Sequence, residues 1–428
     1  MEESNRIEST ADIPDEFLTQ LSSFINENDI KLIPKKQDTY DIVNLFLEKN
    51  HSEEPFLIVN LGEIIRQYQK WTTHLPYIKP YYAVKCNPDL VILNLLYNLG
   101  CNFDCASKNE ISKIINLGAS PERIIFANPC KMISQIKYAR AHDIDLVVFD
   151  DENELYKIKM FHSNARLVLR IKTDDSSSLC RFSCKFGADM NDVENLLRIA
   201  KSLGLNVAGV SFHVGSGCKD KNLYKKAIED TYQVYFMAKN LGLQIEIVDL
   251  GGGFPGYKSK QIDVTFEEIA QTINESIQEY FYDKEQEKFI VEFIAEPGRF
   301  MVASSHTLVL SIINKKTRIN KETSEKEIVY YVNDGVYGSL NNIIYDHFVL
   351  SQDNLFPFNE RNEKRYKSTI YGCTCDGIDR LVEYIMLPDL MCGEYLYVEN
   401  MGAYTLALFN HEELFNGFSK PSIHYILN

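Results

Sequence analysis

The sequence has no long hydrophobic run and no excess of positive charge. None of its apolar stretches approaches the roughly 20 residues needed to span a bilayer. Its first ten residues, MEESNRIEST, are polar and acidic, unlike a signal or transit peptide. With 60 acidic and 45 basic side chains, the formal net charge is −15. Nucleic-acid and anionic-membrane surfaces need a basic footprint, so we expect neither partner.

Paired CxxC spacing is also absent, although the chain contains ten cysteines. Disulfide staples are typical of small secreted domains, and a chain of 428 residues does not need them. Cys101/Cys105 and Cys180/Cys184 have a spacing that could suit zinc, but no histidine pair lies nearby, which favours a structural role for these thiols. We therefore expect a reduced cytoplasmic protein without a bound metal.

What is present is an ordinary globular composition with a regular alternation of β-rich and helical patterns. The length suggests two or three domains. The β-rich runs between about residues 80 and 297 are YYAVKC (81–86), CNFDC (101–105), RIIFAN (123–128), DLVVFD (145–150), RLVLRI (166–171), NVAGVSFHV (206–214), EIVDLGG (246–252) and FIVEFIAE (289–296). They are mostly apolar, as strands buried on both faces should be. The pattern favours a TIM-like (β/α)8 barrel, with a doubly wound open sheet as the alternative.

After residue 300 the pattern changes, and β-rich runs follow one another without long helices between them. These runs are HTLVLSII (306–313), EIVYYVND (327–334), STIYGCT (368–374) and EYLYVENMG (394–402). The charged stretch between the first two, NKKTRINKETSEKE (314–327), is expected to be an exposed loop. A separate β domain is therefore predicted.

Lys85 lies near the end of the first barrel run, where reactive side chains of such barrels sit. A buried lysine is costly unless it is paired or neutralised. Two interpretations are open at this point. The ammonium could simply reach solvent at the strand end, or a lowered pKa could free the amine to form a Schiff base with a carbonyl.

Two glycine clusters and an AEPGR motif end the last three barrel runs. Gly251–Gly253 and the HVGSGC segment (213–218) could bring backbone N–H groups close to a phosphate, or could be tight turns only. Glu296 could keep a pyridinium nitrogen protonated and Arg299 could grip a phosphate, or the two could form a structural ion pair. Together with the lysine, these features favour pyridoxal phosphate.

Many long motifs then occur in an order that closely resembles the eukaryotic ornithine decarboxylase family. They are YYAVKCN, FDCASKNEI, IIFANPCK, LRIKTDD, KFGAD, GVSFHVGSGC, LGGGFPG, AEPGRF, YYVNDGVYGSLN, CTCDGIDR and ENMGAY. The resemblance runs from about residue 30 to the C-terminus and implies an alanine-racemase-like fold. It places the pyridoxal-phosphate barrel in residues 60–300 and the C-terminal β domain in 301–428, with 1–59 joining the β domain.

The resemblance implies roles for individual residues around the cofactor. Lys85 would form the Schiff base, His213 would stack on the cofactor ring, and Glu296 would pair with the ring nitrogen. The phosphate would be held by Ser216, Gly251, Gly252, Gly253, Gly298, Arg299 and Tyr404. A charged network beside the lysine would consist of Asp104, Glu110 and Arg170.

The CTCDG motif is similar to a loop that reaches into the neighbouring subunit's site, which implies a homodimer with shared sites. Cys375 would then protonate the substrate carbon after carbon dioxide leaves. Asp346 and Asp376, with Tyr345 beside them, would bind the distal ammonium of the substrate. The family usually has proline at position 373, where this chain has cysteine, and this loosens the backbone of the loop.

The activity implied is decarboxylation of L-ornithine to putrescine and carbon dioxide, the first step of polyamine biosynthesis. Two alternatives remain: a decarboxylase of the same fold acting on lysine or another basic amino acid, and an inactive binding protein that resembles antizyme inhibitors. Lysine is one methylene longer than ornithine, a difference worth only about 1–3 kcal/mol in a pocket. The segment SQIKYARAH (134–142) resembles part of an antizyme-binding region, so antizyme is a possible partner.

Overall fold

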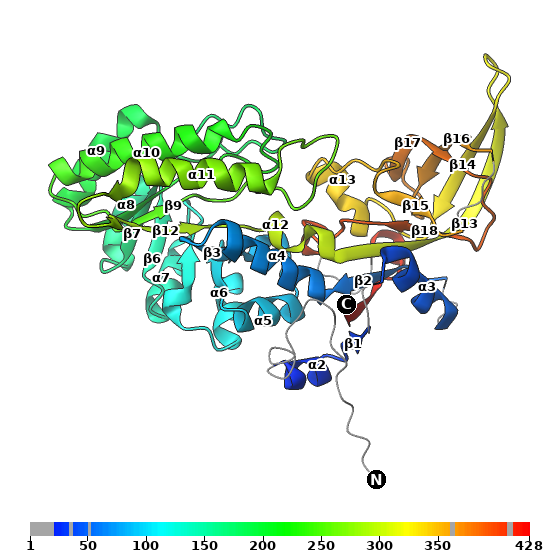
Figure 1. Cartoon of the computed structure of the whole chain (residues 1–428), viewed down its shortest axis with the longest axis horizontal. Coiled ribbons are helices and arrows are strands. Elements are labelled where there is room, and N and C mark those ends of the chain that lie inside the picture. The colour runs from blue at the N-terminus through cyan, green and yellow to red at the C-terminus, as the bar shows by residue number, and fades with distance from the viewer. Residues whose placement is uncertain (1–20, 34–36, 50–52, 360–363, 409–413) are drawn as a thin grey trace, which may run out of the picture. The chain divides into compact units, whose positions relative to one another are not determined.

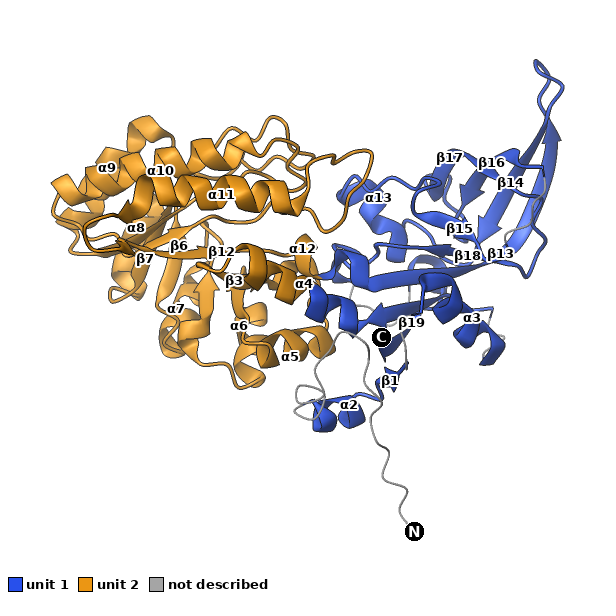
Figure 2. Cartoon of the chain, viewed as in Figure 1, with its two compact units in different colours: residues 1–66, 302–428 blue, residues 67–301 orange. Residues whose placement is uncertain are grey.

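A computed structural model describes residues 21–33, 37–49, 53–359, 364–408 and 414–428 of the chain. The chain divides into two compact units, one made of residues 1–66 and 302–428 and the other of residues 67–301 (Figure 2). We call them the sheet unit and the barrel unit, and we describe each by itself.

The barrel unit contains eight parallel strands that close into a ring (Figure 1). They are β3 (Ile78–Ala83), β4 (Asn102–Cys105), β5 (Ile124–Phe126), β6 (Leu146–Phe149), β7 (Arg166–Arg170), β8 (Asn206–Ser211), β9 (Ile247–Asp249) and β12 (Glu292–Ala295). Phe293 of β12 pairs with Ile78 of β3 on one side and with Val248 of β9 on the other, which closes the ring. The predicted barrel is confirmed, and the open sheet is excluded.

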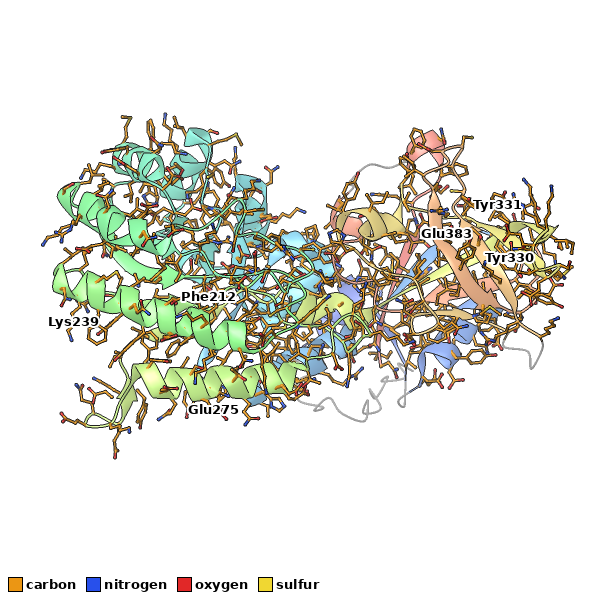
Figure 3. The ribbon with its side chains drawn as sticks, turned by 90° about the horizontal axis from the view of Figure 1, so that it is seen from above. Phe212, Lys239, Glu275, Tyr330, Tyr331 and Glu383 are labelled. Carbon is orange, nitrogen blue, oxygen red and sulfur yellow. The ribbon has the colours of Figure 1, made fainter. Side chains whose placement is uncertain are left out.

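Helices follow the barrel strands and cover their outer side (Figure 1). They are α5 (Leu90–Asn98), α6 (Lys108–Asn116), α7 (Ile133–Ala141), α8 (Glu152–Phe161), α9 (Met190–Ser202), α10 (Asn222–Asn240) and α11 (Phe266–Phe281). A further helix, α4 (Leu61–His74), precedes β3 and begins within the sheet unit. Phe212 is buried within the unit, whereas Lys239 of α10 and Glu275 of α11 are exposed (Figure 3). Within the described ranges, no helix is both long and apolar enough to cross a bilayer.

Side chains fill the interior of the barrel. One buried cluster consists of Tyr81, Ile125, Leu146, Val148, Val168, Ile247 and Ile294. The barrel is therefore a packed core and not a pore. The polar side chains Asp104, Arg170 and Asp249 lie at the carboxyl ends of the strands, and Lys85, His213 and Glu296 lie in the turns that follow.

The sheet unit is built around a sheet that joins both ends of the chain. Its strands are β1 (Lys31–Leu32), β2 (Phe56–Asn60), β13 (His306–Ile319), β14 (Lys326–Val332), β15 (Leu355–Pro357), β16 (Tyr366–Tyr371), β17 (Arg380–Leu387), β18 (Tyr395–Val398) and β19 (Ser422–Leu427). The N-terminal strand β2 lies between β13 and the C-terminal strand β19. The helices described here, α2 (Ser22–Glu27), α3 (Thr39–Lys49) and α13 (Asn342–Tyr345), are short.

The charged stretch 314–327 is mostly strand, so its interpretation as a loop is wrong. β13 runs to Ile319 and pairs in antiparallel register with β14, which begins at Lys326. β14 is anchored because Tyr330 is fully buried, while Tyr331 beside it is only partly buried (Figure 3). Backbone pairing to this anchored strand extends the hairpin beyond the core. Charge composition indicates exposure to solvent, and an exposed segment can still be a strand.

Candidate active site

Lys85 follows β3 in a short 3₁₀ turn, Val84–Cys86, so the strand ends two residues before it. Its Nζ forms an ion pair with Oδ2 of Asp104, which lies on the neighbouring strand β4. The Asp104 side chain is fully buried, whereas 41% of the Lys85 side chain is exposed. The amine is thus held by a buried carboxylate at one end of the barrel while remaining accessible to a carbonyl compound.

Glu110 lies in the first turn of α6, close to this ion pair. Its Oε2 accepts a hydrogen bond from the Ala106 N–H at 2.6 Å, and Ser107 Oγ accepts one from the Glu110 N–H at 3.3 Å. Burial raises the pKa of Glu110, and the Ala106 N–H opposes that rise. The direct contact of Glu110 is therefore with the backbone, and it acts on Lys85 and Asp104 through its charge.

Arg170 ends β7 and supplies a second positive charge at the same end of the barrel. Its guanidinium lies over the ring of Phe186, 5.3 Å from the centroid. The carboxylates that act on it electrostatically belong to Glu296, Asp150, Asp249 and Asp104. Arg170 is therefore the positive centre of a group of acids.

His213 follows β8 and is held in one tautomer. Its Nδ1 accepts a hydrogen bond from the Gly215 N–H at 3.0 Å, which leaves the proton of the neutral ring on Nε2. Burial lowers the pKa of His213 well below its usual value, and the charges of Arg170 and Lys85 lower it further. At neutral pH this side chain is an uncharged flat ring, which suits packing on an aromatic cofactor.

The turns after β8 and β9 meet beside Arg299, where only glycine fits. A Cβ at Gly251 would lie 2.1 Å from the Phe212 carbonyl oxygen, and a Cβ at Gly253 would lie 2.6 Å from that of Gly215. Arg299 Nη2 donates to Ser216 Oγ at 3.0 Å. Closely packed glycine turns with an arginine and a hydroxyl are suited to holding a phosphate group.

Two further glycines keep space open near the reactive groups. A Cβ at Gly252 would lie 2.9 Å from Nε2 of His213, and a Cβ at Gly298 would lie 2.9 Å from Cβ of Cys86. Any larger residue at either position would therefore crowd the imidazole or the turn that carries Lys85.

Glu296 is buried at the end of β12, and its N–H donates to the Gly251 carbonyl at 2.7 Å. Burial raises the pKa of Glu296 well above its usual value, and the carboxylates of Asp104 and Asp249 add to the rise. The Glu296 carboxyl is therefore ready to share a proton with a basic nitrogen.

In the sheet unit, Cys375 is exposed in the loop that joins β16 to β17. Its N–H donates to Oδ1 of Asn416 at 3.1 Å. Asp379 organises the same loop, because its Oδ2 accepts hydrogen bonds from the N–H of Thr374 at 3.0 Å and from its hydroxyl at 2.6 Å. Oδ1 of Asp379 accepts from the Val336 N–H at 2.9 Å. The Cys375 thiol is thus exposed on a loop that several hydrogen bonds hold in place.

Asp376 lies beside Cys375 and remains ionised at neutral pH. Hydrogen bonds from the Ile378 N–H at 3.0 Å and from the Tyr337 hydroxyl at 2.5 Å lower its pKa. The Tyr337 ring stacks on Phe415 with 4.6 Å between centroids. A carboxylate held in this way can bind a cation next to the thiol.

The remaining predicted residues also lie in the sheet unit. Asp346 is buried just after α13, whereas 70% of the neighbouring Tyr345 is exposed. Tyr404 is partly buried and has a positive φ of 55°. This left-handed conformation costs a non-glycine residue about 1–2 kcal/mol, and such strain clusters at functional sites.

Several residues of these sites were missed in the sequence. Asp249 directly precedes Leu250 and the glycine cluster, so the rule that strand ends carry chemistry could have identified it. Asn416 contacts Cys375 from 41 residues away in the chain, and Phe415 stacks on Tyr337, the residue that donates to Asp376. No local pattern connects these residues to the loop.

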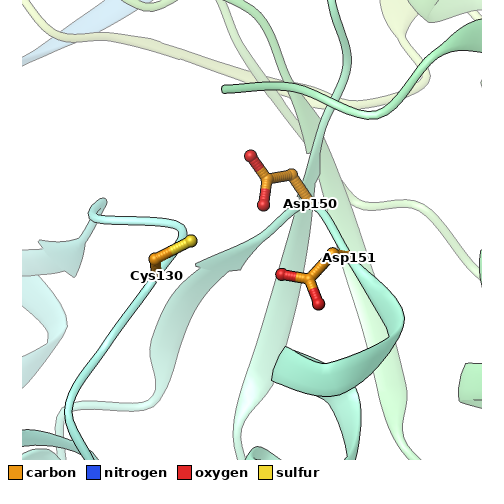
Figure 4. Close-up of side chains that lie close together, drawn as sticks. All are labelled: Cys130, Asp150 and Asp151. Atoms are coloured by element: carbon orange, nitrogen blue, oxygen red, sulfur yellow. The ribbon is translucent and has the colours of Figure 1, made fainter. Parts of the chain in front are cut away.

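Cys130, Asp150 and Asp151 form the one group of potential metal ligands found in the described part of the chain (Figure 4). Their ligand atoms lie within 4.8 Å of one another. Burial raises the pKa of the Cys130 thiol, and the two aspartates raise it further. A protonated thiol is a poor ligand, and exposed acidic groups often cluster without an ion, so we assign no metal to this group.

Comparisons with known proteins agree with this geometry. A family model for the pyridoxal binding domain of pyridoxal-dependent decarboxylases matches residues 61–303. Ornithine decarboxylase of Rattus norvegicus is 44% identical over 393 residues, which cover 89% of this chain and 82% of that protein. Antizyme inhibitor 2 of Xenopus laevis is 42% identical over 416 residues, which cover 95% of this chain and 89% of that protein.

Solved structures of related decarboxylases also match the fold. The arginine decarboxylase of Paramecium bursaria Chlorella virus has a TM-score of 0.82 and 32% identity, covering 91% of this chain and 100% of that chain. A lysine/ornithine decarboxylase from Vibrio vulnificus, complexed with cadaverine, has a TM-score of 0.78 and 29% identity, covering 91% of this chain and 98% of that chain. The matching structures therefore differ in the basic amino acid that their names specify.

Proposed function

The chain belongs to the family of pyridoxal-dependent decarboxylases that contains the ornithine decarboxylases, and on this basis we propose that it converts L-ornithine to putrescine and carbon dioxide. This reaction would be the first step of polyamine biosynthesis. The observation that carries the proposal is the loop in which an exposed thiol, Cys375, lies next to Asp376, whose pKa is held low. A proton donor beside a cation-binding carboxylate suits a diamine product.

Pyridoxal phosphate is the cofactor, and the residues of the barrel unit fit it. Lys85 supplies an accessible amine beside the buried Asp104 carboxylate. Arg299, bonded to Ser216, stands beside the glycine turns where a phosphate can bind. Glu296 supplies a buried carboxyl of raised pKa for the ring nitrogen. When bound, pyridoxal phosphate supplies an electron sink for the pair left by the departing carboxylate.

In the proposed mechanism, the side chains position the groups and move the protons. Lys85 would hold the cofactor through its amine, and Glu296 would keep a proton at the ring nitrogen. His213, which is neutral, would face the ring without adding charge. Cys375 donates its Sγ proton to the substrate Cα after carbon dioxide leaves. A positioned general acid of this kind contributes about 10²–10⁴-fold to the rate.

Recognition of the substrate is assigned to the sheet unit. Asp376 and Asp346, with Tyr345 beside them, would bind the distal ammonium of ornithine. We infer that the chain acts as a homodimer in which the Cys375 loop serves the partner's cofactor, as the resemblance implies. Binding of antizyme through α7 stays a prediction. A cytoplasmic location also stays a prediction, although a proton-donating cysteine requires a reducing environment.

The test is a substrate panel. Purified protein with pyridoxal phosphate is incubated with L-ornithine, L-lysine, L-arginine and meso-diaminopimelate, and the release of carbon dioxide is measured. We expect the highest kcat/KM for ornithine. Faster turnover of lysine or arginine would reassign the substrate. Bound cofactor without turnover of any of the four would favour an inactive binding protein, as the antizyme inhibitor relative suggests. Lys85→Ala serves as the blank.

A further inference from the structure

Asp249 has a buried carboxyl group that has no role in the mechanism proposed above. It ends β9 and is fully buried. Its Oδ1 accepts a hydrogen bond from the Gly251 N–H at 2.9 Å. Its Oδ2 is buried and has no N–H or hydroxyl donor among the residues that the structure describes. The Glu296 carboxyl lies close enough to Asp249 for the two to share a hydrogen bond when one of them is protonated.

The two carboxyls are held together by the barrel itself. β9 and β12 are neighbouring strands, with Asp249 opposite Ile294. Gly251 clamps both acids, because its N–H donates to Asp249 and its carbonyl accepts from the Glu296 N–H at 2.7 Å. Two ionised carboxylates contain only acceptors, so a hydrogen bond between them requires one proton.

The charges around the pair also call for one proton. The titratable groups that face it are Lys85, Arg170, Asp104, Asp150, His213 and Tyr81. His213 is neutral, and Asp150 is partly exposed and accepts the Gly187 N–H at 2.7 Å. That leaves two cations, Lys85 and Arg170, beside the three buried acids Asp104, Asp249 and Glu296, so one shared proton reduces the excess of negative charge.

The pKa shifts of Asp249 and Glu296 also indicate one shared proton. Burial raises the pKa of Asp249 to about 7, with a further rise from the Asp104 carboxylate. Burial also raises the pKa of Glu296 well above its usual value. In the protein without cofactor, the pair therefore retains one proton. A pair that shares a proton titrates as a unit, so the higher pKa belongs to both residues.

We propose that Asp249 and Glu296 hold one proton between them in the protein without cofactor, and that the pair gives up this proton when the pyridinium nitrogen of the cofactor binds beside Glu296. Asp249 is then a positioning residue that acts through Glu296. The O–H bond of the pair would break and its proton would pass to the solvent, so the pair would gain one negative charge that faces the positively charged ring. The proposal depends on the proposed function in one respect: it assumes that the ring nitrogen of the cofactor faces Glu296.

The first test counts protons when pyridoxal phosphate binds. Asp249→Asn keeps an oxygen for the Gly251 N–H and presents an amide N–H to Glu296, so the pair no longer needs a proton. Binding is measured by calorimetry at pH 7 in buffers of different ionisation enthalpy. We expect Asp249→Asn to take up about one more proton per site than the wild type, because its pair has none to give. An unchanged proton count would overturn the proposal.

The control is Asp192→Asn on the exposed side of α9, which should bind the cofactor with the wild-type proton count. If Asp249 only supported the glycine turn through Gly251, the asparagine would preserve that contact and the count would not change. No substrate is used in this experiment. A wrong substrate assignment would therefore leave the result intact and would appear only in the substrate panel.

The second test needs no cofactor and uses urea unfolding of the full chain between pH 5 and pH 7. The folded pair retains a proton that the unfolded chain has released, so the wild type should lose stability as pH rises through this window. We expect this loss to be smaller by about one proton in Asp249→Asn. If that variant does not fold, Glu296→Gln removes the same proton and should flatten the profile equally. A wild-type slope in the folded variant would overturn the proposal.

Discussion

Cys373 and Cys375 stand two positions apart but differ in their surroundings. Cys373 is partly buried, and burial raises its pKa to about 12, with help from the charges of Asp334 and Asp379. Cys375 is exposed beside Asp376. The high pKa makes the Cys373 thiol a weak acid and a poor nucleophile, so we propose the exposed Cys375 as the proton donor.

Replacing each thiol separately tests this assignment. We expect Cys375→Ala to lower kcat about 10²–10⁴-fold, because a positioned acid is lost. Of the ornithine that is consumed, a larger fraction should give products other than putrescine. Cys373→Ala should retain most of the activity. Both quantities can be measured by chromatography of the products. Equal losses in the two variants would contradict the assignment.

Asp334 gives the sheet unit a pH-dependent stability of its own. It is fully buried, its Oδ1 accepts the Gly335 N–H at 2.7 Å, and burial raises its pKa to about 6. The folded chain therefore keeps a proton that the unfolded chain loses above a pH of about 4. Stability from this group is fully present below pH 4 and is lost as pH rises through 6.

The expected result is a loss of about 1 kcal/mol between pH 5 and pH 7 that is attributable to Asp334. Asp334→Asn keeps an oxygen for the Gly335 N–H and removes the titration, so its unfolding free energy should change less over this range. Urea unfolding at several pH values measures the difference. The exposed substitution Asp353→Asn is the matched control. If wild type and Asp334→Asn have parallel pH profiles, Asp334 does not titrate as described.

At the scale of elements, a buried lysine ties the turn after β5 to β6 and α8. Lys131 is fully buried and donates to the carbonyls of Asn128 at 2.9 Å and Val148 at 2.5 Å. It also forms an ion pair with Glu154 at 2.8 Å, and Glu154 forms a second ion pair with the partly exposed Lys157. The turn after β5, the strand β6 and the helix α8 thus meet at one ammonium.

Because the two lysines share one glutamate, they can be compared directly. We expect Lys131→Ala to lower the free energy of unfolding by about 3–5 kcal/mol, since it leaves buried groups without their partner. Lys157→Ala should cost less than about 1 kcal/mol because water screens this pair. Urea unfolding measures the stability of both variants. Similar losses of stability would show that the burial of Lys131 does not determine the strength of its interactions.

The strands of the barrel were predictable, but several of their ends were not. The largely apolar runs indicated all eight strands because each is buried on both faces. Lys85, however, lies in a turn beyond Ala83, since the apolar pattern continues where the strand pairing stops. The opposite error occurred at 314–327, where pairing continues after the apolar pattern stops.

At the scale of the whole molecule, the proposed homodimer predicts complementation between two inactive variants. Lys85→Ala lacks the amine and Cys375→Ala lacks the proton donor. If each site takes these residues from different subunits, a heterodimer has one intact site. An equal mixture after subunit exchange should therefore recover about a quarter of the wild-type activity. The measurement is carbon dioxide release, with exchange verified by differently tagged subunits. No recovery after verified exchange would show that both residues serve the same site.

The sequence by itself determined the barrel, the β-rich C-terminal part and, through long ordered motifs, the family with its candidate lysine, glycines and thiol. These features can be recognised from local sequence patterns, because apolar periodicity and glycine clusters depend on residues that are close together along the chain. Only the tertiary structure brought Asp249 against Glu296 and Asn416 against Cys375. A buried carboxyl has its pKa set by groups on other strands, and no local pattern contains those distances.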